Sequence, residues 1–180
     1  MPAAPARPCD REAIVTIQIV ARPPRYLLDG TFHHVTARAT GDQALFVDDE
    51  DRAYFMSLLR YSNRRWRWKL HAYCLMTTHY HLLVEAPLER LSRGMHRLNF
   101  LYATNFNGRY NRRGRLFADR FASFVIRDEE HYCAACEYIL QNPVKAGLCA
   151  RAPTTGGGAA SDRLFEPWRG NVPRRGSSGR

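Results

Sequence analysis

The chain has 180 residues, of which 45% are hydrophobic and 24% charged, and this composition is typical of one globular domain with its own core. Its 27 Lys and Arg outnumber its 17 Asp and Glu, so the formal net charge is +10. A surface this basic favours a polyanionic partner, most often nucleic acid, and a basic protein without such a partner is the alternative.

Cysteine usage and hydropathy argue against a secreted or membrane protein. The five cysteines follow no regular framework, which indicates a reducing, cytoplasmic and, for a DNA-binding protein, nucleoid-associated location. The longest apolar run near the start, residues 13–20, is far shorter than the ~20 residues of a membrane span and lacks a signal-peptide layout. No membrane partner is therefore expected.

The first part of the chain contains one arm, one strand and one helix. Residues 1–24 are rich in Ala, Pro and Arg and are predicted to be a flexible N-terminal arm. Residues 31–40 carry β-branched and aromatic side chains and predict a strand. Acidic residues at 48–51 suit a helix N-terminus, and the apolar spacing that follows predicts a helix from 49 to about 65.

A hairpin and a second helix come next. Two apolar stretches, 71–76 and 79–85, are joined by the polar pair Thr77-Thr78 and predict two antiparallel strands. After Pro87, apolar residues at helical spacing predict a helix over 88–109.

The last part of the predicted domain contains a basic loop, a strand and a third helix. Residues 107–115 are basic and contain turn-forming Gly, and 121–126 predict a fourth strand. A third helix is expected to begin at the acids 128–130 and to end near Asn142, because the residue before a proline, here Pro143, disfavours helical geometry. Residues 151–180 are predicted to be a flexible tail.

This order predicts an α+β fold of the ferredoxin-like split βαβ type, with a four-stranded antiparallel sheet and two helices on one face. The third helix is an addition at the C-terminal end of the domain, which is expected to span residues 25–150.

The pattern His79-Tyr80-His81 is the first candidate for chemistry. Alternate strand residues point to the same face, so both imidazoles are expected to lie side by side, as in a divalent metal site. Two ligands are too few for firm binding, and a third must come from elsewhere. An HxH pattern alone is more often structural.

The third helix supplies the second candidate. Tyr138 and Asn142 are one turn apart and can face the same site, whereas Tyr132, Cys136 and Ile139 form an apolar stripe that can pack inward. A tyrosine beside a metal suggests a nucleophile activated by a nearby cation or base. The pair Cys133 and Cys136 lacks a second Cys/His pair at zinc-finger spacing and is attributed to core packing.

The basic loop is the third candidate. Arginines alternating with aromatic residues are typical of a surface that binds single-stranded nucleic acid through phosphate contacts and stacking, although a solvated loop is the alternative. The residues are Arg109, Arg112, Arg113 and Arg115, with Tyr110 and Phe117.

Two segments carry a family resemblance: MTTHYHLLVEAP at 76–87 and EYILQNPVKAGL at 137–148, with weaker support from 21–55 and 114–126. In their order and spacing the chain resembles the HUH single-strand DNA transposases with one catalytic tyrosine, and it is most similar to the REP-associated tyrosine transposases. The resemblance covers about residues 20–150. Thr77-Thr78 stands where relatives often have Pro-Asn, and Arg38-Ala39-Thr40 where they have Arg-Gly-Asn.

The resemblance implies a set of roles. His79 and His81 would be metal ligands, Tyr138 the nucleophile and Asn142 the third ligand, with Mg²⁺ or Mn²⁺ as the metal. Attack of Tyr138 on a phosphate in single-stranded or hairpin DNA would give a 5′-phosphotyrosine adduct and a free 3′-OH. Relatives include monomers and homodimers, so Tyr138 is expected to serve its own histidines or those of a partner.

Two rival functions remain open, and so does the start of translation. A domesticated DNA-binding protein on the same fold would bind hairpins with little or no cleavage. A hydrolase of small phosphoesters fits the net charge poorly. The family resemblance begins at Val20, so initiation there is expected, and residues 1–19 are predicted to have no role in the fold; a short strand or helix over Ile14–Val20 is the alternative.

Overall fold

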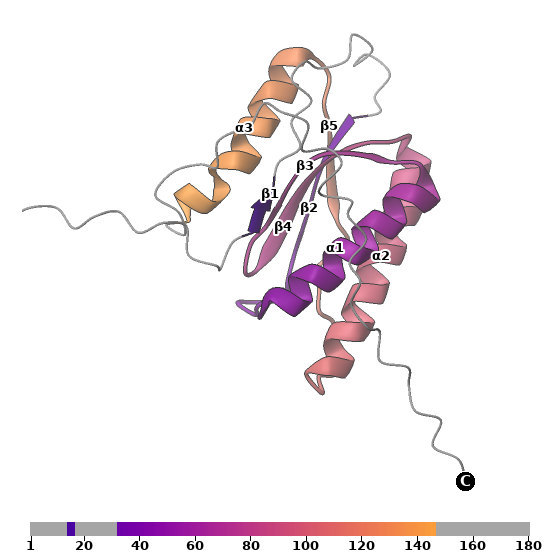
Figure 1. Ribbon diagram of the computed structural model, residues 1–180, viewed down its shortest axis with the longest axis vertical. Coiled ribbons are helices and arrows are strands. Elements are labelled where there is room, and N and C mark those ends of the chain that lie inside the picture. The colour runs from indigo at the N-terminus through magenta and orange to yellow at the C-terminus, as the bar shows by residue number, and fades with distance from the viewer. Residues whose placement is uncertain (1–13, 17–31, 147–180) are drawn as a thin grey trace, which may run out of the picture.

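The computed structural model describes residues 14–16 and 32–146, which form one sheet and three helices (Figure 1). Along the chain the elements are β1 Ile14–Thr16, β2 Phe32–Arg38, α1 Asp49–Trp66, β3 Lys69–Leu75, β4 His79–Glu85, α2 Leu88–Arg109, β5 Ala122–Val125 and α3 Glu129–Lys145. Within these residues, no helix is both long and apolar enough to cross a membrane.

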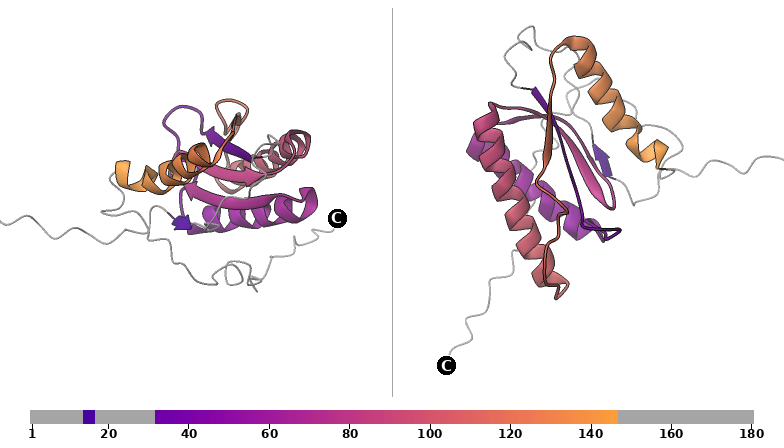
Figure 2. Two further views of the ribbon diagram at one scale, coloured as in Figure 1. Left: turned by 90° about the horizontal axis from the view of Figure 1, so that it is seen from above. Right: turned by 180° about the vertical axis from the view of Figure 1, so that it is seen from behind.

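The sheet has the strand order β1-β3-β4-β2-β5, and every neighbouring pair is antiparallel. The four predicted strands are β2, β3, β4 and β5, and their spatial order is that of the ferredoxin-like split βαβ fold. Helices α1 and α2 cover one face and α3 lies on the other (Figures 1 and 2). The predicted fold class is therefore confirmed.

A fifth strand, β1, lies at one edge of the sheet. Residues Ile14–Thr16 pair with β3 in the register Ile14↔Leu75 to Thr16↔Tyr73. This pairing agrees with the alternative of a short strand in this segment, and it gives β3 a hydrogen-bonded neighbour on its outer side. The other residues of the predicted arm, and the predicted tail at 151–180, lie outside the described residues.

Two buried clusters hold the layers together. The larger joins the sheet to α1 and α2 and includes Val35, Phe55, Tyr80 and Tyr102. The smaller joins the other face to α3 and consists of Phe32, Ala72, Cys74, Met76, Leu83, Ile126, Tyr132, Ala135, Cys136 and Ile139. The inward stripe predicted for the third helix is confirmed, and Cys136 is a core residue.

Helix α3 differs from its predicted end. It runs to Lys145 and contains Pro143, which is buried. Pro143 has no N–H to donate to the carbonyl of Ile139, but only one bond of the last turn is lost. The N–H of Ala146 donates to the carbonyl of Asn142 at 3.0 Å, so the turn still closes. Burial of the proline ring stabilises an extension that the sequence rule disfavours.

Candidate active site

Strand β4 positions the two predicted histidines at the centre of the sheet. It is flanked by β3 and β2, and the ring centroids of His79 and His81 lie 5.1 Å apart. Both share the face that carries Leu83, toward α3, whereas Tyr80 is buried on the opposite face. The Tyr80 hydroxyl donates to Oδ1 of Asn99 at 2.8 Å and is thereby held in the core.

The Nδ1 atom of each histidine lies at hydrogen-bond distance from another side chain. Nδ1 of His79 lies 3.0 Å from Oγ1 of Thr78, and Nδ1 of His81 lies 3.0 Å from Nε2 of His34. Nε2 of His81 is buried and has no hydrogen-bond partner. A buried polar atom without a partner is uncommon in folded proteins. An orphaned imidazole nitrogen is the kind of group that a divalent cation would satisfy.

Tyr138 lies directly against this histidine cluster. Its ring is edge-on to His81 at 5.4 Å and to His34 at 5.7 Å between centroids. Nζ of Lys145 lies 5.3 Å from the centroid of the Tyr138 ring. The side chain remains 43% exposed, so a substrate can reach it. The structure thus brings together, within one chain, three of the residues predicted for the site: His79, His81 and Tyr138.

The side chain of Asn142 is partly used within α3. Its side-chain nitrogen Nδ2 donates to the carbonyl oxygen of Tyr138 at 2.8 Å, one turn earlier in α3. This contact leaves the amide oxygen as the only side-chain atom available for a cation. Within the described residues, no three His, Cys, Asp or Glu side chains converge as a metal site. Among the described residues, a third protein ligand would come from a donor of another kind, such as the amide oxygen of Asn142.

Burial keeps the imidazoles neutral. It lowers the pKa of His81 to about 3, with further lowering from His34, His79 and Arg38. Burial, followed by Arg38, lowers the pKa of His79, and burial, followed by His131, lowers that of His34. Neutral imidazoles keep the lone pairs that a metal needs, and they suit Mn²⁺ better than the oxygen-preferring Mg²⁺. The donors present therefore fit a divalent ion.

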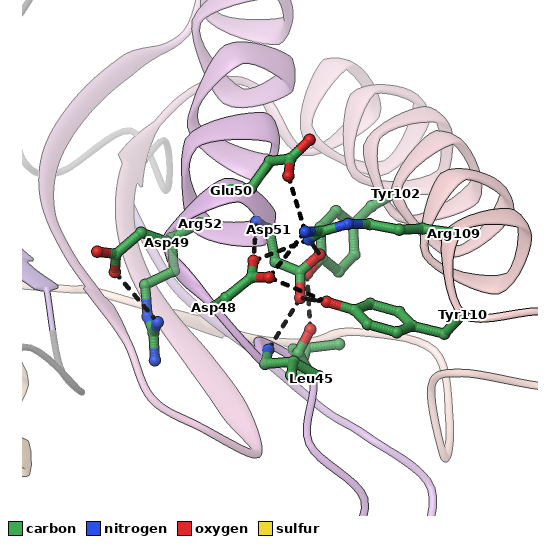
Figure 3. Close-up of polar contacts among 10 residues, drawn as sticks. Leu45, Asp48, Asp49, Glu50, Asp51, Arg52, Tyr102, Arg109 and Tyr110 are labelled. Carbon is green, nitrogen blue, oxygen red and sulfur yellow. Dashed lines mark hydrogen bonds and ion pairs between the residues drawn. The ribbon is translucent and has the colours of Figure 1, made fainter.

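The predicted role of Arg109 is not supported by its contacts. Its guanidinium forms ion pairs of 2.7 Å with Asp48, Glu50 and Asp51 at the start of α1, as Figure 3 shows. The Tyr110 hydroxyl donates to Asp51 in the same cluster at 2.9 Å. A guanidinium bound to three carboxylates links the end of α2 to the start of α1, and its two terminal nitrogens are used in these contacts in place of a phosphate.

The other three predicted arginines differ in their freedom. Arg112 donates to Oε1 of Gln43 and lies over the ring of Phe106, 5.6 Å from its centroid. Arg113 and Arg115 are exposed, on either side of Gly114, whose φ of 92° makes the sharp turn. These two residues keep the charge that a phosphate-binding surface needs.

Comparison with known proteins identifies the family. The family model described as IS200-like transposase matches residues 30–142, which include the histidine pair, Tyr138 and Asn142. The chain belongs to the IS200-like transposase family. This membership confirms the family resemblance and makes the protein a transposase-like, DNA-processing protein.

The fold of this IS200-like transposase also matches a solved structure. That structure is a REP-associated tyrosine transposase bound to a REP hairpin, with 19% sequence identity and a TM-score of 0.56. The match covers 89% of this chain and 98% of the other, and the two proteins share the fold. No curated protein gives a significant match.

Sequence reasoning missed three residues beside the histidine pair of this IS200-like transposase. His34 faces His81 from β2, Arg38 stands opposite His79 in the β2–β4 register, and Thr78 contacts the His79 ring. His34 and Arg38 are far from the HxH pattern in sequence, so only the strand register reveals them. Thr78 was visible as a departure from relatives, but its contact with the histidine was not.

Proposed function

We propose that the protein is a metal-dependent single-strand DNA endonuclease and strand transferase that cuts hairpin or repeat DNA through Tyr138. The observation that carries this proposal is the packing of the Tyr138 ring against His81, whose buried Nε2 has no partner. A tyrosine packed against a histidine ring whose Nε2 has no partner places a candidate nucleophile beside a nitrogen that can bind a metal, and this arrangement suits attack on a phosphate.

In the proposed reaction, Oη of Tyr138 attacks the phosphorus of a scissile phosphodiester. The phenol proton passes to solvent or a neighbouring base, the bond from phosphorus to O3′ breaks, and O3′ takes up a proton. The products are a 5′-phosphotyrosine and a free 3′-OH. The new ester conserves the energy of the phosphodiester, so a 3′-OH can attack it in turn and rejoin DNA without ATP.

Nε2 of His79, Nε2 of His81 and the amide oxygen of Asn142 would hold the ion, Mg²⁺ or Mn²⁺. When bound, the ion would polarise the phosphate and offset the charge that develops on it. The chain's own residues would orient the substrate. Arg38 beside His79 and Lys145 over the Tyr138 ring add fixed positive charge at the place where the phosphate would lie.

The expected substrate is single-stranded or hairpin DNA. The net charge of +10 supports a polyanion, and the protein of similar fold is described as bound to a REP hairpin. Tyr138 contacts the histidines of its own chain, which supports cleavage by a single chain without a residue from a partner copy.

The test is formation of a covalent protein–DNA adduct. The full chain is incubated with Mn²⁺ and labelled single-stranded hairpins taken from repeats beside its gene, and the products are separated on a denaturing gel. A labelled band at the protein's position supports the proposal. Hairpin binding without any adduct or cut strand would favour the rival function, a DNA-binding protein that has lost cleavage.

A further inference from the structure

His34 is the one member of the histidine cluster to which neither the sequence nor the family match gives a role. It lies on β2, two residues before Thr36, which the strand register pairs with His81. His34 and His81 are therefore diagonal neighbours on the same face of the sheet. Their rings are tilted by 33° with centroids 5.1 Å apart. Nε2 of His34 is 3.0 Å from Nδ1 of His81, which is hydrogen-bond distance.

One hydrogen lies between those two nitrogens. Whether His34 or His81 carries it determines whether Nε2 of His81 can bind a cation. If His34 donates, the neutral ring of His81 must carry its own hydrogen on Nε2, and that nitrogen has no lone pair for a cation. If His81 donates from Nδ1, Nε2 keeps its lone pair and His34 carries its hydrogen on Nδ1.

We propose that His34 is a positioning residue: it accepts the Nδ1 hydrogen of His81 and so fixes the tautomer in which His81 Nε2 faces the divalent ion. This inference rests on the proposed function. Metal-binding histidines commonly donate their second ring N–H to a fixed acceptor, which sets both tautomer and ring orientation. Here the acceptor is a neutral imidazole in place of the carboxylate or carbonyl usual at such sites.

The arrangement around His79 supports the same reading. Nδ1 of His79 lies 3.0 Å from Oγ1 of Thr78, so this ring too can donate from Nδ1 and leave Nε2 free. Both histidines of the pair therefore have their Nδ1 atoms engaged by the protein. His34 also touches the Tyr138 ring, so it fixes the ligand from a place next to the nucleophile without displacing it.

Two substitutions separate the hydrogen bond from the packing. His34→Phe keeps a ring of similar size and removes the acceptor, whereas His34→Gln offers an amide oxygen near the place of Nε2. His96→Gln, on exposed helix surface, is the control for loss of a histidine. Mn²⁺ affinity is measured by calorimetry on the full chain, with the melting temperature of the metal-free protein as a check on folding.

We expect His34→Phe to weaken Mn²⁺ binding about 10- to 100-fold, as for other residues that orient a metal ligand, and His34→Gln and His96→Gln to bind within about threefold of the parent. At saturating Mn²⁺, adduct formation by His34→Phe should return to the parent rate, because Tyr138 and both ligands remain. Long-range ¹H–¹⁵N spectra of the Mg²⁺-bound parent should place the His81 hydrogen on Nδ1.

Two results would overturn the role of His34: equal Mn²⁺ affinity in the parent and in His34→Phe, or a His81 hydrogen on Nε2 in the Mg²⁺-bound parent. If His34→Phe does not fold, the role of His34 is tested by two other results. It is overturned if the folded His34→Gln variant loses Mn²⁺ affinity and the His81 hydrogen of the Mg²⁺-bound parent lies on Nε2. A parent that binds no Mn²⁺ would instead overturn the proposed metal dependence itself.

Discussion

The ring of Tyr138 stands edge-on against the ring of His81, with 5.4 Å between their centroids. The two residues are far apart in sequence, and helix α3 and strand β4 bring them together across the smaller of the two buried clusters. The contact places the proposed nucleophile beside one of the two proposed metal-binding histidines.

Replacing Tyr138 by Phe should abolish the covalent adduct and leave DNA binding nearly unchanged. Phe keeps the edge-on ring contacts with His81 and His34 and removes only the nucleophilic oxygen. Adduct gels and anisotropy titrations with the same hairpin measure the two properties. Adduct formation at the parent rate would assign the nucleophile to another residue, and the buried Tyr80 and Tyr132 are poor substitutes.

Replacing His79 or His81 by Ala should stop cleavage and weaken Mn²⁺ binding, because each change removes one of only three proposed protein ligands. Calorimetric titration of Mn²⁺ into the folded variants measures the effect, and chelation of the metal should stop the parent in the same way. His96→Ala provides the control on a helix surface. If the His81 and His96 variants bound Mn²⁺ equally well, the histidine pair would be structural.

Removing Arg113 and Arg115 together, as the double Gln variant, should weaken DNA binding and reduce the slope of log affinity against log salt by about 2, roughly one for each phosphate contact. Anisotropy titrations at several salt concentrations give the slope. The double change Arg64→Gln and Arg90→Gln removes the same charge from exposed positions on α1 and α2. Equal slopes for the two double variants would show that only net charge matters.

Replacing Arg109 by Met should destabilise the fold by about 2 kcal/mol at neutral pH, less than for a fully buried pair because Arg109 is partly exposed. The Arg109 guanidinium, followed by the backbone N–H of Asp51, lowers the pKa of Asp48 to about 2, below its ordinary 3.8. The stability that Asp48 gains from this shift is fully present when the pH is above the pKa of Asp48 in the unfolded chain. It is lost as the pH falls through the lower pKa of Asp48 in the folded protein.

Denaturant titrations of the parent and of Arg109→Met at several pH values measure the loss. The gap in unfolding free energy should be widest near neutral pH and should narrow between about pH 4 and pH 2. Arg109→Lys keeps the charge without the planar fork, so an intermediate loss is expected. If the difference in unfolding free energy between the parent and Arg109→Met did not change with pH, Arg109 would not be responsible for the lowered pKa of Asp48.

Deleting residues 1–19 should lower the melting temperature by about 2–4 °C, the shift expected for about 1 kcal/mol in a domain of this size. The deletion removes β1 and leaves the outer edge of β3 unpaired. Deleting residues 1–13 keeps β1 and is the matched control. A melting temperature that falls equally in both, or in neither, would contradict a stabilising role for β1.

Periodicity predicted the helices well because their signals are local. Helix α2 has the predicted bounds, and α1 ends one residue later than expected, since capping acids and apolar spacing lie within the segment itself. The end of α3 was wrong because burial of Pro143 is a property of packing. Three-residue β1 is too short for a periodic signal and depends on its partner β3.

The site shows the same division. His79, His81 and Tyr138 could be found from motifs, whereas the contact of His34 with His81 depends on strand register. Arg109 looked like a free cation because its three carboxylate partners are about sixty residues away in the chain. Charge counted along a sequence does not show which cations are already paired.

The central place of β4 in the sheet has a consequence for hydrogen exchange. Its backbone is bonded on one side to β2 and on the other to β3, so its amides should exchange only when the whole domain unfolds. Helix α3 packs mainly on β3 and β4, over the smaller cluster, and its amides should exchange through local opening. The two histidines on β4 would then keep their positions until the domain unfolds. Tyr138 would leave and regain its place beside them each time α3 opens locally, which happens on a shorter timescale.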